Sequence, residues 1–135
     1  MSLKAIWSRL APPSSAAVRY RVLLVCLGNI CRSPTAEAVL HHKLHLAGLG
    51  DCVEVDSAGT YGGHAGARPD ERACKHAARR GYELAHLRAR KVADDDFVRF
   101  DLLLAMDGNN LATLRERCPS EPQLQKKLRC LVEFI

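Results

Sequence analysis

The sequence predicts an α/β fold of three layers, in which a four-stranded parallel sheet is flanked by helices. Two observations carry this prediction. Short apolar runs of strand length, such as Val22–Val25 and Leu102–Ala105, alternate along the chain with stretches whose apolar residues recur at helical spacing. At 135 residues the chain also has the size of one domain. Strands that alternate with helices favour right-handed crossovers and a parallel sheet.

The expected elements follow in order. Ser33 stands as a capping hydroxyl before Pro34, a proline at the first helical position, and Gly48 ends that helix. Asp70 is the expected N-cap of another helix, which Gly81 ends. The expected strands are 22–25, 52–55, 102–105 and 130–135, and the expected helices are 34–47, 70–80, 94–100, 110–117 and 123–128.

The loop between the first strand and its helix has the composition of an oxyanion site. Its backbone N–H groups converge with the first turn of the helix, where the dipole is positive, and Arg32 supplies a bidentate fork. Cys26, at the start of the loop, is expected to act as a thiolate nucleophile in this electropositive hollow. A phosphate-binding loop after the first strand is therefore predicted from Leu27, Gly28, Asn29, Ile30, Cys31 and Arg32.

Simpler interpretations exist for single residues. A lone cysteine at the end of an apolar strand is usually a small buried hydrophobe. The conjunction of strand, Gly28-Asn29, Arg32 and helix start favours catalysis. The sequence lacks the Gly-x-x-x-x-Gly-Lys of nucleotide-binding P-loops, and one glycine makes no dinucleotide fingerprint. His41 and His45, four residues apart, are expected to be surface residues.

These residues resemble the signature loop of the low-molecular-weight protein tyrosine phosphatases. The resemblance covers roughly residues 20 to 135, and its motifs are Cys26 to Ser33, Asp56-Ser57-Ala58-Gly59-Thr60, Ala85-His86-x-x-Ala89-Arg90, Asp96-Phe97-x-x-Phe100-Asp101 and Ala105-Met106-Asp107-x-x-Asn110-Leu111. It implies hydrolysis of phosphotyrosine monoesters through a phosphocysteine, with no cofactor and no metal. The implied partners are a phosphotyrosine-containing protein and inorganic phosphate, as product and inhibitor.

The resemblance also implies roles for individual residues. Cys26, Arg32 and Ser33 would be catalytic, with the Ser33 hydroxyl favouring the thiolate. Asn29, in a left-handed conformation, would be braced by Ser33, Ser57 and His86. For Ser57 and His86 a local turn or cap role is the alternative. Cys31 is a candidate redox partner of Cys26, or else a small buried hydrophobe.

Two further features of the family have no counterpart in this sequence. The family's general acid is an Asp in an Asp-Pro-Tyr segment after the fourth strand, and no Asp-Pro occurs here. The acid is therefore unknown, and Asp107 is a candidate whose other role would be loop support. The expected explanation is that the sequence is a truncated version of a longer chain. The aromatic wall of the substrate pocket aligns with Gly63 and His64, next to Tyr61.

Composition and charge are consistent with an intracellular enzyme. The net charge is +5, yet the basic residues are scattered and only 5% of residues are aromatic, so neither nucleic acid nor a membrane is expected as partner. Six cysteines without a Cys-x-x-Cys pair predict reduced thiols in the cytoplasm. Residues 1–20 are expected to be a flexible leader, or alternatively a transit peptide, before a phosphatase domain of 21–135.

Two other functions remain open from the sequence. A thiol-dependent arsenate reductase can use a similar Cys and Arg loop, but it needs a relay of further cysteines, and Cys74 and Cys118 are not closely spaced. A phosphoprotein-binding module without catalysis could retain the anion loop alone.

Overall fold

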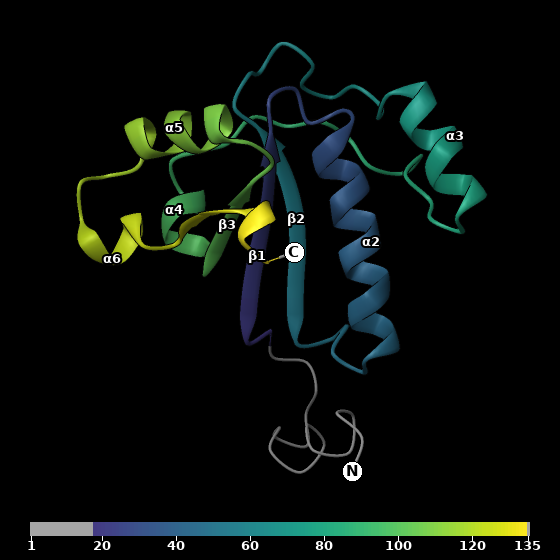
Figure 1. Ribbon diagram of the computed structural model, residues 1–135, viewed down its shortest axis with the longest axis horizontal. Coiled ribbons are helices and arrows are strands. Elements are labelled where there is room, and N and C mark those ends of the chain that lie inside the picture. Colours follow the sequence, from purple (N-terminus) through teal and green to yellow (C-terminus); the bar gives the residue numbers. More distant parts are fainter. Residues whose placement is uncertain (1–17, 135) are drawn as a thin grey trace.

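A four-stranded parallel sheet forms the centre of the molecule (Figure 1). The computed structural model describes residues 18–134, so most of the predicted leader lies outside the described residues. The strands stand in the order β2-β1-β3-β4, with bounds of β1 Tyr20–Cys26, β2 Val53–Gly59, β3 Leu102–Ala105 and β4 Leu128–Cys130. Because all strands are parallel, their carboxyl ends meet at one edge, at the top of Figure 1. The predicted fold class is confirmed.

The helices lie on both faces of this sheet. They are α2 Arg32–Leu46, α3 Glu71–Arg79, α4 Asp96–Arg99, α5 Gly108–Arg117, α6 Pro122–Gln125 and the 3₁₀ helix η1 Leu131–Phe134. Figure 1 shows α4, α5 and α6 on one side of the sheet and α2 and α3 on the other. Asp70 caps α3 as predicted, since its carboxylate accepts a hydrogen bond from the Ala73 N–H at 3.1 Å.

Side chains along β1 alternate between two cores. Leu23 and Val25 face the larger core, together with Phe97, Phe100 and Leu114 from the helical layer. Val22 and Leu24 face the opposite side and pack against α2. This alternation buries every residue of β1 from Val22 to Cys26, as expected for a central parallel strand.

The second face of the sheet is only partly covered. An apolar groove of about 1530 Å³ opens between α2, α3 and η1, and the sheet residues Leu24, Leu102 and Leu104 line its floor. No helix within residues 18–134 is long and apolar enough to cross a membrane.

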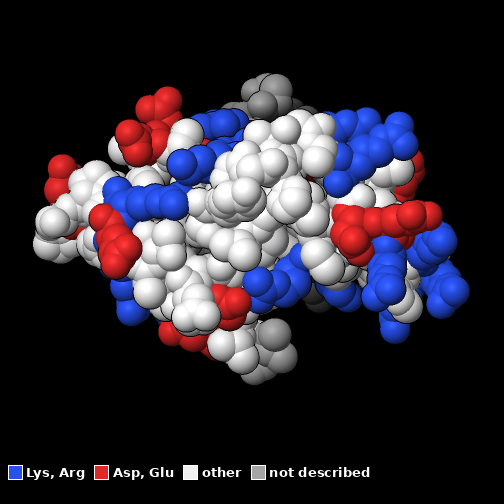
Figure 2. All heavy atoms as spheres, turned by 90° about the horizontal axis from the view of Figure 1, so that it is seen from above, with Lys and Arg blue, Asp and Glu red and all other residues white. Residues whose placement is uncertain are grey.

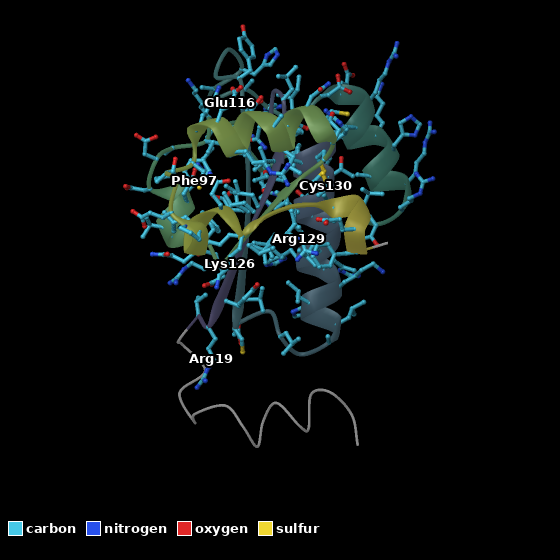
Figure 3. The ribbon with its side chains drawn as sticks, turned by 60° about the vertical axis from the view of Figure 1, so that its left-hand side comes forward. Arg19, Phe97, Glu116, Lys126, Arg129 and Cys130 are labelled. Atoms are coloured by element: carbon cyan, nitrogen blue, oxygen red, sulfur yellow. The ribbon has the colours of Figure 1, made fainter. Side chains whose placement is uncertain are left out.

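The predicted fourth strand is wrong in its position. The sequence favoured residues 130–135, but β4 is Leu128–Cys130 and pairs with β3 from Leu103 to Ala105. The chain then turns into η1 because the Glu133 carboxylate accepts hydrogen bonds from the Cys130 N–H at 2.8 Å and from Arg129 Nε at 3.0 Å. Arg129 and Cys130 mark this turn in Figure 3. An apolar run alone could not reveal that local turn.

The second strand is longer than predicted. β2 continues past Val55 to Gly59, because residues 56–59 pair in parallel register with residues 23–26 of β1. Ser57 is thereby placed in the sheet, next to the carboxyl end of β1 that carries Cys26, within reach of the loop that follows.

Candidate functional site: a cysteine in an oxyanion loop

Cys26 is the last residue of β1, and it is buried at the carboxyl edge of the sheet. The loop of residues 27–31 follows and leads into α2. Gly59, opposite Cys26 in β2, lies directly beneath this loop: a Cβ on Gly59 would stand 2.6 Å from the Leu27 carbonyl oxygen and 3.0 Å from the Asn29 nitrogen. Glycine at 59 therefore allows the loop to lie close against β2.

Two donors point at the sulfur of Cys26. The Asn29 backbone N–H lies 3.3 Å from Sγ, and the Ser33 hydroxyl oxygen lies 3.0 Å from it. With Cys26 in the thiolate form, the sulfur has no proton, so Ser33 is the donor of that hydrogen bond. The two contacts tie the sulfur to the centre of the loop and to the first turn of α2.

Ser33 does not cap the helix, contrary to the prediction. α2 begins at Arg32, two residues before the expected Pro34, and its N-cap, Cys31, makes no side-chain cap. The Ser33 side chain is fully buried and its hydroxyl is engaged by Cys26 and Asn29. Sequence spacing placed the start of the helix to within two residues, but it could not show that the hydroxyl points inward.

Asn29 organises the loop from its centre. Its backbone is left-handed, with φ 57°, and it is the one non-glycine residue with positive φ among residues 18–134. The side-chain amide donates to Ser33 Oγ at 2.8 Å and to Ser57 Oγ at 2.9 Å, while Oδ1 accepts from the Arg90 backbone N–H at 2.9 Å. The side chain is buried, so all three bonds hold the loop in one shape.

His86 is not among the partners of Asn29. The resemblance implied that it would brace this residue, but His86 is exposed and lines a cavity on the far side of Glu37. The backbone of Arg90 fills the position instead. The prediction for His86 was wrong because a motif match gives the order of residues and not the course of the irregular chain between them.

Arg32 and Asp107 form an ion pair beside the loop. Arg32 Nη1 lies 2.7 Å from Asp107 Oδ2, and Asp107 also caps α5 by accepting from the Asn110 N–H at 2.8 Å. The hydrogen bond to Asp107 raises the pKa of Arg32, and the same bond lowers the pKa of Asp107. Asp107 is thus a carboxylate that supports the loop, as the alternative interpretation had it, and it is poorly suited to donate a proton.

The remaining loop residues form an open rim. Leu27 and Cys31 are exposed, and Gly28 and Ile30 are partly exposed. The His64 ring lies over Gly28, since a Cβ added to Gly28 would stand 2.9 Å from it. The rings of Tyr61 and His64 are packed edge to face, with their centroids 5.9 Å apart. Because Cys31 is exposed, its interpretation as a buried hydrophobe is wrong.

The face that carries the loop is seen in Figure 2. Uncharged residues occupy its middle, and Lys and Arg side chains stand on several sides of them. Residues 18–134 bring together no set of three His, Cys, Asp or Glu residues arranged to hold a metal ion. The donors at this site are backbone N–H groups, hydroxyls and a guanidinium, and these groups suit an oxyanion.

An ionised cluster centred on Arg90, which the sequence did not reveal, supports the loop. Arg90 holds Asp56 in the middle of β2, with Nη2 3.0 Å from Oδ2, and Asp96 at the start of α4, with Nη1 2.9 Å from Oδ2. These ion pairs hold Arg90 in place, and its backbone N–H donates to Asn29 Oδ1. Arg90, Asp56 and Asp96 all occur in motifs of the resemblance, but the spacing gave no sign that they meet.

Glu37 is the second missed residue. It lies one turn after Ser33 on α2, and its carboxylate accepts from Ser57 Oγ at 2.6 Å. Burial raises the pKa of Glu37 to about 7; the hydrogen bond from Ser57 opposes this rise, the negative charge of Asp56 adds to it, and Arg90 lowers it. A carboxyl four residues from Ser33 was the available signal, since such residues share a helix face.

A buried cysteine at the end of a parallel strand, inside a loop of donors and at a helix start, defines a thiol-dependent enzyme site for phosphoryl or similar oxyanion groups. The family model described as low molecular weight phosphotyrosine protein phosphatase matches residues 21–135. The chain belongs to this family.

Several relatives agree with the family match. The chain is 41% identical over 114 residues to a putative low molecular weight protein-tyrosine-phosphatase of Synechocystis, covering 84% of this chain and 71% of the relative. It is 48% identical over 107 residues to the low molecular weight protein-tyrosine-phosphatase of Streptomyces coelicolor, covering 79% of this chain and 65% of the relative. The human low molecular weight phosphotyrosine protein phosphatase is 39% identical over 113 residues, with 84% and 71% covered. The chain thus spans about two thirds of these relatives' length.

Solved structures agree in fold. A protein tyrosine phosphatase from Entamoeba histolytica, crystallised with Hepes in its active site, superposes with a TM-score of 0.81 at 41% identity, covering 85% of this chain and 72% of that one. YfkJ from Bacillus subtilis gives a TM-score of 0.82 at 35% identity, covering 87% and 72%.

Proposed function

We propose that this chain hydrolyses phosphotyrosine monoesters of proteins through a phosphocysteine intermediate. The observation that carries the proposal is the pair of contacts at Cys26 Sγ, made by the Asn29 N–H and the Ser33 hydroxyl. Family membership supports the same reaction. The catalytic residues in this proposal are Cys26, Arg32 and Ser33.

The first step is attack of the Cys26 thiolate on phosphorus. The sulfur–phosphorus bond forms as the bond to the phenol oxygen breaks, and the loop N–H groups with Arg32 bind the equatorial oxygens. The phenol oxygen takes a proton from solvent water as it leaves. Asp107 is held as an anion by Arg32, so we assign it to loop support and assign this proton transfer to no residue among 18–134.

The second step is attack of water on the phosphocysteine. Inorganic phosphate is released and the thiolate re-forms, and the Ser33 hydroxyl stabilises the departing sulfur through the same hydrogen bond. Phosphate, as the product, fits the same donors and is expected to inhibit. No cofactor, nucleic acid or membrane takes part in this scheme.

The setting of this activity is part of the proposal. All six cysteines are free thiols in the structure, which is consistent with a reducing compartment, and we place the protein in the cytoplasm. Its partner is a protein that presents phosphotyrosine to the rim formed by Leu27, Tyr61 and His64.

The test is hydrolysis of p-nitrophenyl phosphate by the wild type and by Cys26→Ser, with Cys118→Ser as the control because Cys118 is buried in the core away from the loop. We expect no turnover for Cys26→Ser and near wild-type turnover for Cys118→Ser. Phosphopeptide binding without a burst of product in the wild type would favour a binding module. Arsenate consumption coupled to thioredoxin, without phosphate release, would favour an arsenate reductase.

We also propose Cys31 as the redox partner of Cys26. Peroxide would take two electrons and two protons from the two thiols, giving a disulfide and water, and would reversibly block the nucleophile. Cys31 is exposed and therefore accessible to oxidant. Peptide mapping of peroxide-treated protein should find the Cys26–Cys31 linkage, with Cys31→Ser as the control. Recovery of both thiols in reduced form after loss of activity would contradict the proposal.

A further inference from the structure

Four side chains form a ring beneath the loop, made of three hydrogen bonds and closed by one turn of the α2 backbone. α2 contributes Ser33 and Glu37, which lie one turn apart on the same helix face; Asn29 comes from the loop and Ser57 from β2. Asn29 bonds to both serines, and Ser57 bonds to Glu37 at 2.6 Å. The ring thus connects the sulfur of Cys26, through Ser33, Asn29 and Ser57, to the carboxyl of Glu37 one turn further along α2.

The hydrogens in this ring have a fixed direction. The two N–H bonds of the Asn29 amide are both used, one on each serine oxygen. With Cys26 as the thiolate, the Ser33 hydroxyl donates to Cys26 Sγ, and the Ser57 hydroxyl donates to Glu37. An ionised Glu37 is an acceptor only and preserves this direction, whereas a protonated Glu37 offers a competing proton to Ser57.

We propose that Glu37 is a positioning residue: its carboxylate anchors Ser57 and, through Asn29, holds the loop around Cys26 in its reactive shape. The loop then responds to pH near neutrality, because the pKa of Glu37 is raised to about 7 by burial. Above that pH the anchor is charged and strong, and below it the anchor weakens. The kinetic part of this inference rests on the proposed phosphatase function, but loop geometry does not.

The surroundings of Glu37 give it access to solvent and set its charge. A cavity of about 510 Å³ borders Glu37 on the side away from the loop. Asp56 from β2 disfavours the carboxylate and Arg90 favours it, although Arg90 donates its hydrogen bonds to Asp56 and Asp96. The titratable groups lining the cavity come from α2 and from residues 82–86: His41, His42, His45, Tyr82, Glu83 and His86. Glu83, which is exposed, adds a negative charge to the same cavity but makes no bond to the ring.

The experiment compares the wild type with Glu37→Gln, a neutral isostere, and with Glu83→Gln as the matched control in the same cavity. The first measurement is the rate of Cys26 alkylation by iodoacetamide from pH 5.5 to 8.5, with the site located by tandem mass spectrometry. The second is kcat for p-nitrophenyl phosphate over the same range. Iodoacetamide carries no titrating group, so its rate reports the protein.

We expect the alkylation rate and kcat of the wild type, each divided by the value for Glu37→Gln, to rise from about 1 at pH 5.5 to about 3–10 at pH 8. A change of about 3–10-fold is the size expected when one charge-assisted hydrogen bond is weakened. Glu83→Gln should follow the wild type. Ser57→Ala removes the hydroxyl that Glu37 binds, so this variant should also lose the rise in alkylation rate and kcat that depends on Glu37 near neutral pH.

A ratio that stays constant across pH would show a merely structural role and overturn the proposal, as would an equal effect of Glu83→Gln. The proposal would also be overturned if Ser57→Ala kept the rise in alkylation rate and kcat near neutral pH. If the wild type hydrolyses no phosphate ester while the alkylation ratio rises as expected, the positioning role of Glu37 stands and the proposed phosphatase function falls.

Discussion

Replacing Glu37 by Gln should make the protein more stable at pH 8 while it slows the enzyme. A carboxyl whose pKa is higher in the folded state than in the unfolded chain contributes stability at low pH and loses that contribution as pH rises through the folded value. For Glu37 the pKa rises from 4.5 to about 7, which corresponds to about 3 kcal/mol at 1.36 kcal/mol per pKa unit. Glu37 is only partly buried, so solvent screening reduces the expected effect to about 1–2 kcal/mol.

The measurement is urea unfolding at pH 5 and pH 8 for the wild type, Glu37→Gln and Glu83→Gln. At pH 5, just above the unfolded pKa of 4.5, only a small part of the difference should have developed, so Glu37→Gln should exceed the wild type only slightly in free energy of unfolding. At pH 8 Glu37→Gln should exceed the wild type by about 1–2 kcal/mol, while Glu83→Gln should match the wild type at both values. A Glu37→Gln protein equal to or weaker than the wild type at pH 8 would refute the reasoning, because the buried charge would then cost nothing.

Three further predictions concern the support of the loop. Gly59→Ala should lower kcat and destabilise the protein by about 1–3 kcal/mol, since its Cβ would stand 2.6 Å from the loop backbone. Gly108→Ala is the control: its Cβ would meet open space, so kcat should be unchanged and α5 should be stabilised by at most about 1 kcal/mol. Thermal melts and kcat compare the two variants. Arg90→Lys should lower the free energy of unfolding in urea by about 1–3 kcal/mol and also lower kcat, because lysine cannot clamp both Asp56 and Asp96, and unchanged values would show that the clamp is dispensable. Asp107→Asn should keep kcat for phenyl phosphate within about tenfold of the wild type, and a loss of 10²–10⁴ would instead identify Asp107 as the general acid.

Local chemistry in the sequence was enough to place most of the elements. β3 has the predicted bounds, and α2, α3 and α5 begin and end within about two residues of those expected, because Gly48, Asp70 and Gly81 act through local backbone preferences. The fourth strand was misplaced, because its pairing depends on β3, which lies far away in sequence, and on the contact of Glu133 with Cys130.

The parallel fold could be inferred from the strands and helices that alternate along the chain, and the place of Cys26 between a strand and a helix start from its immediate neighbours. The ring behind the loop could not. Glu37, Ser57 and Arg90 come from a helix, a strand and an irregular segment, and they meet only when the sheet assembles. The raised pKa of Glu37 has the same origin, because desolvation is a property of the packed molecule and not of the residue's neighbours in the chain.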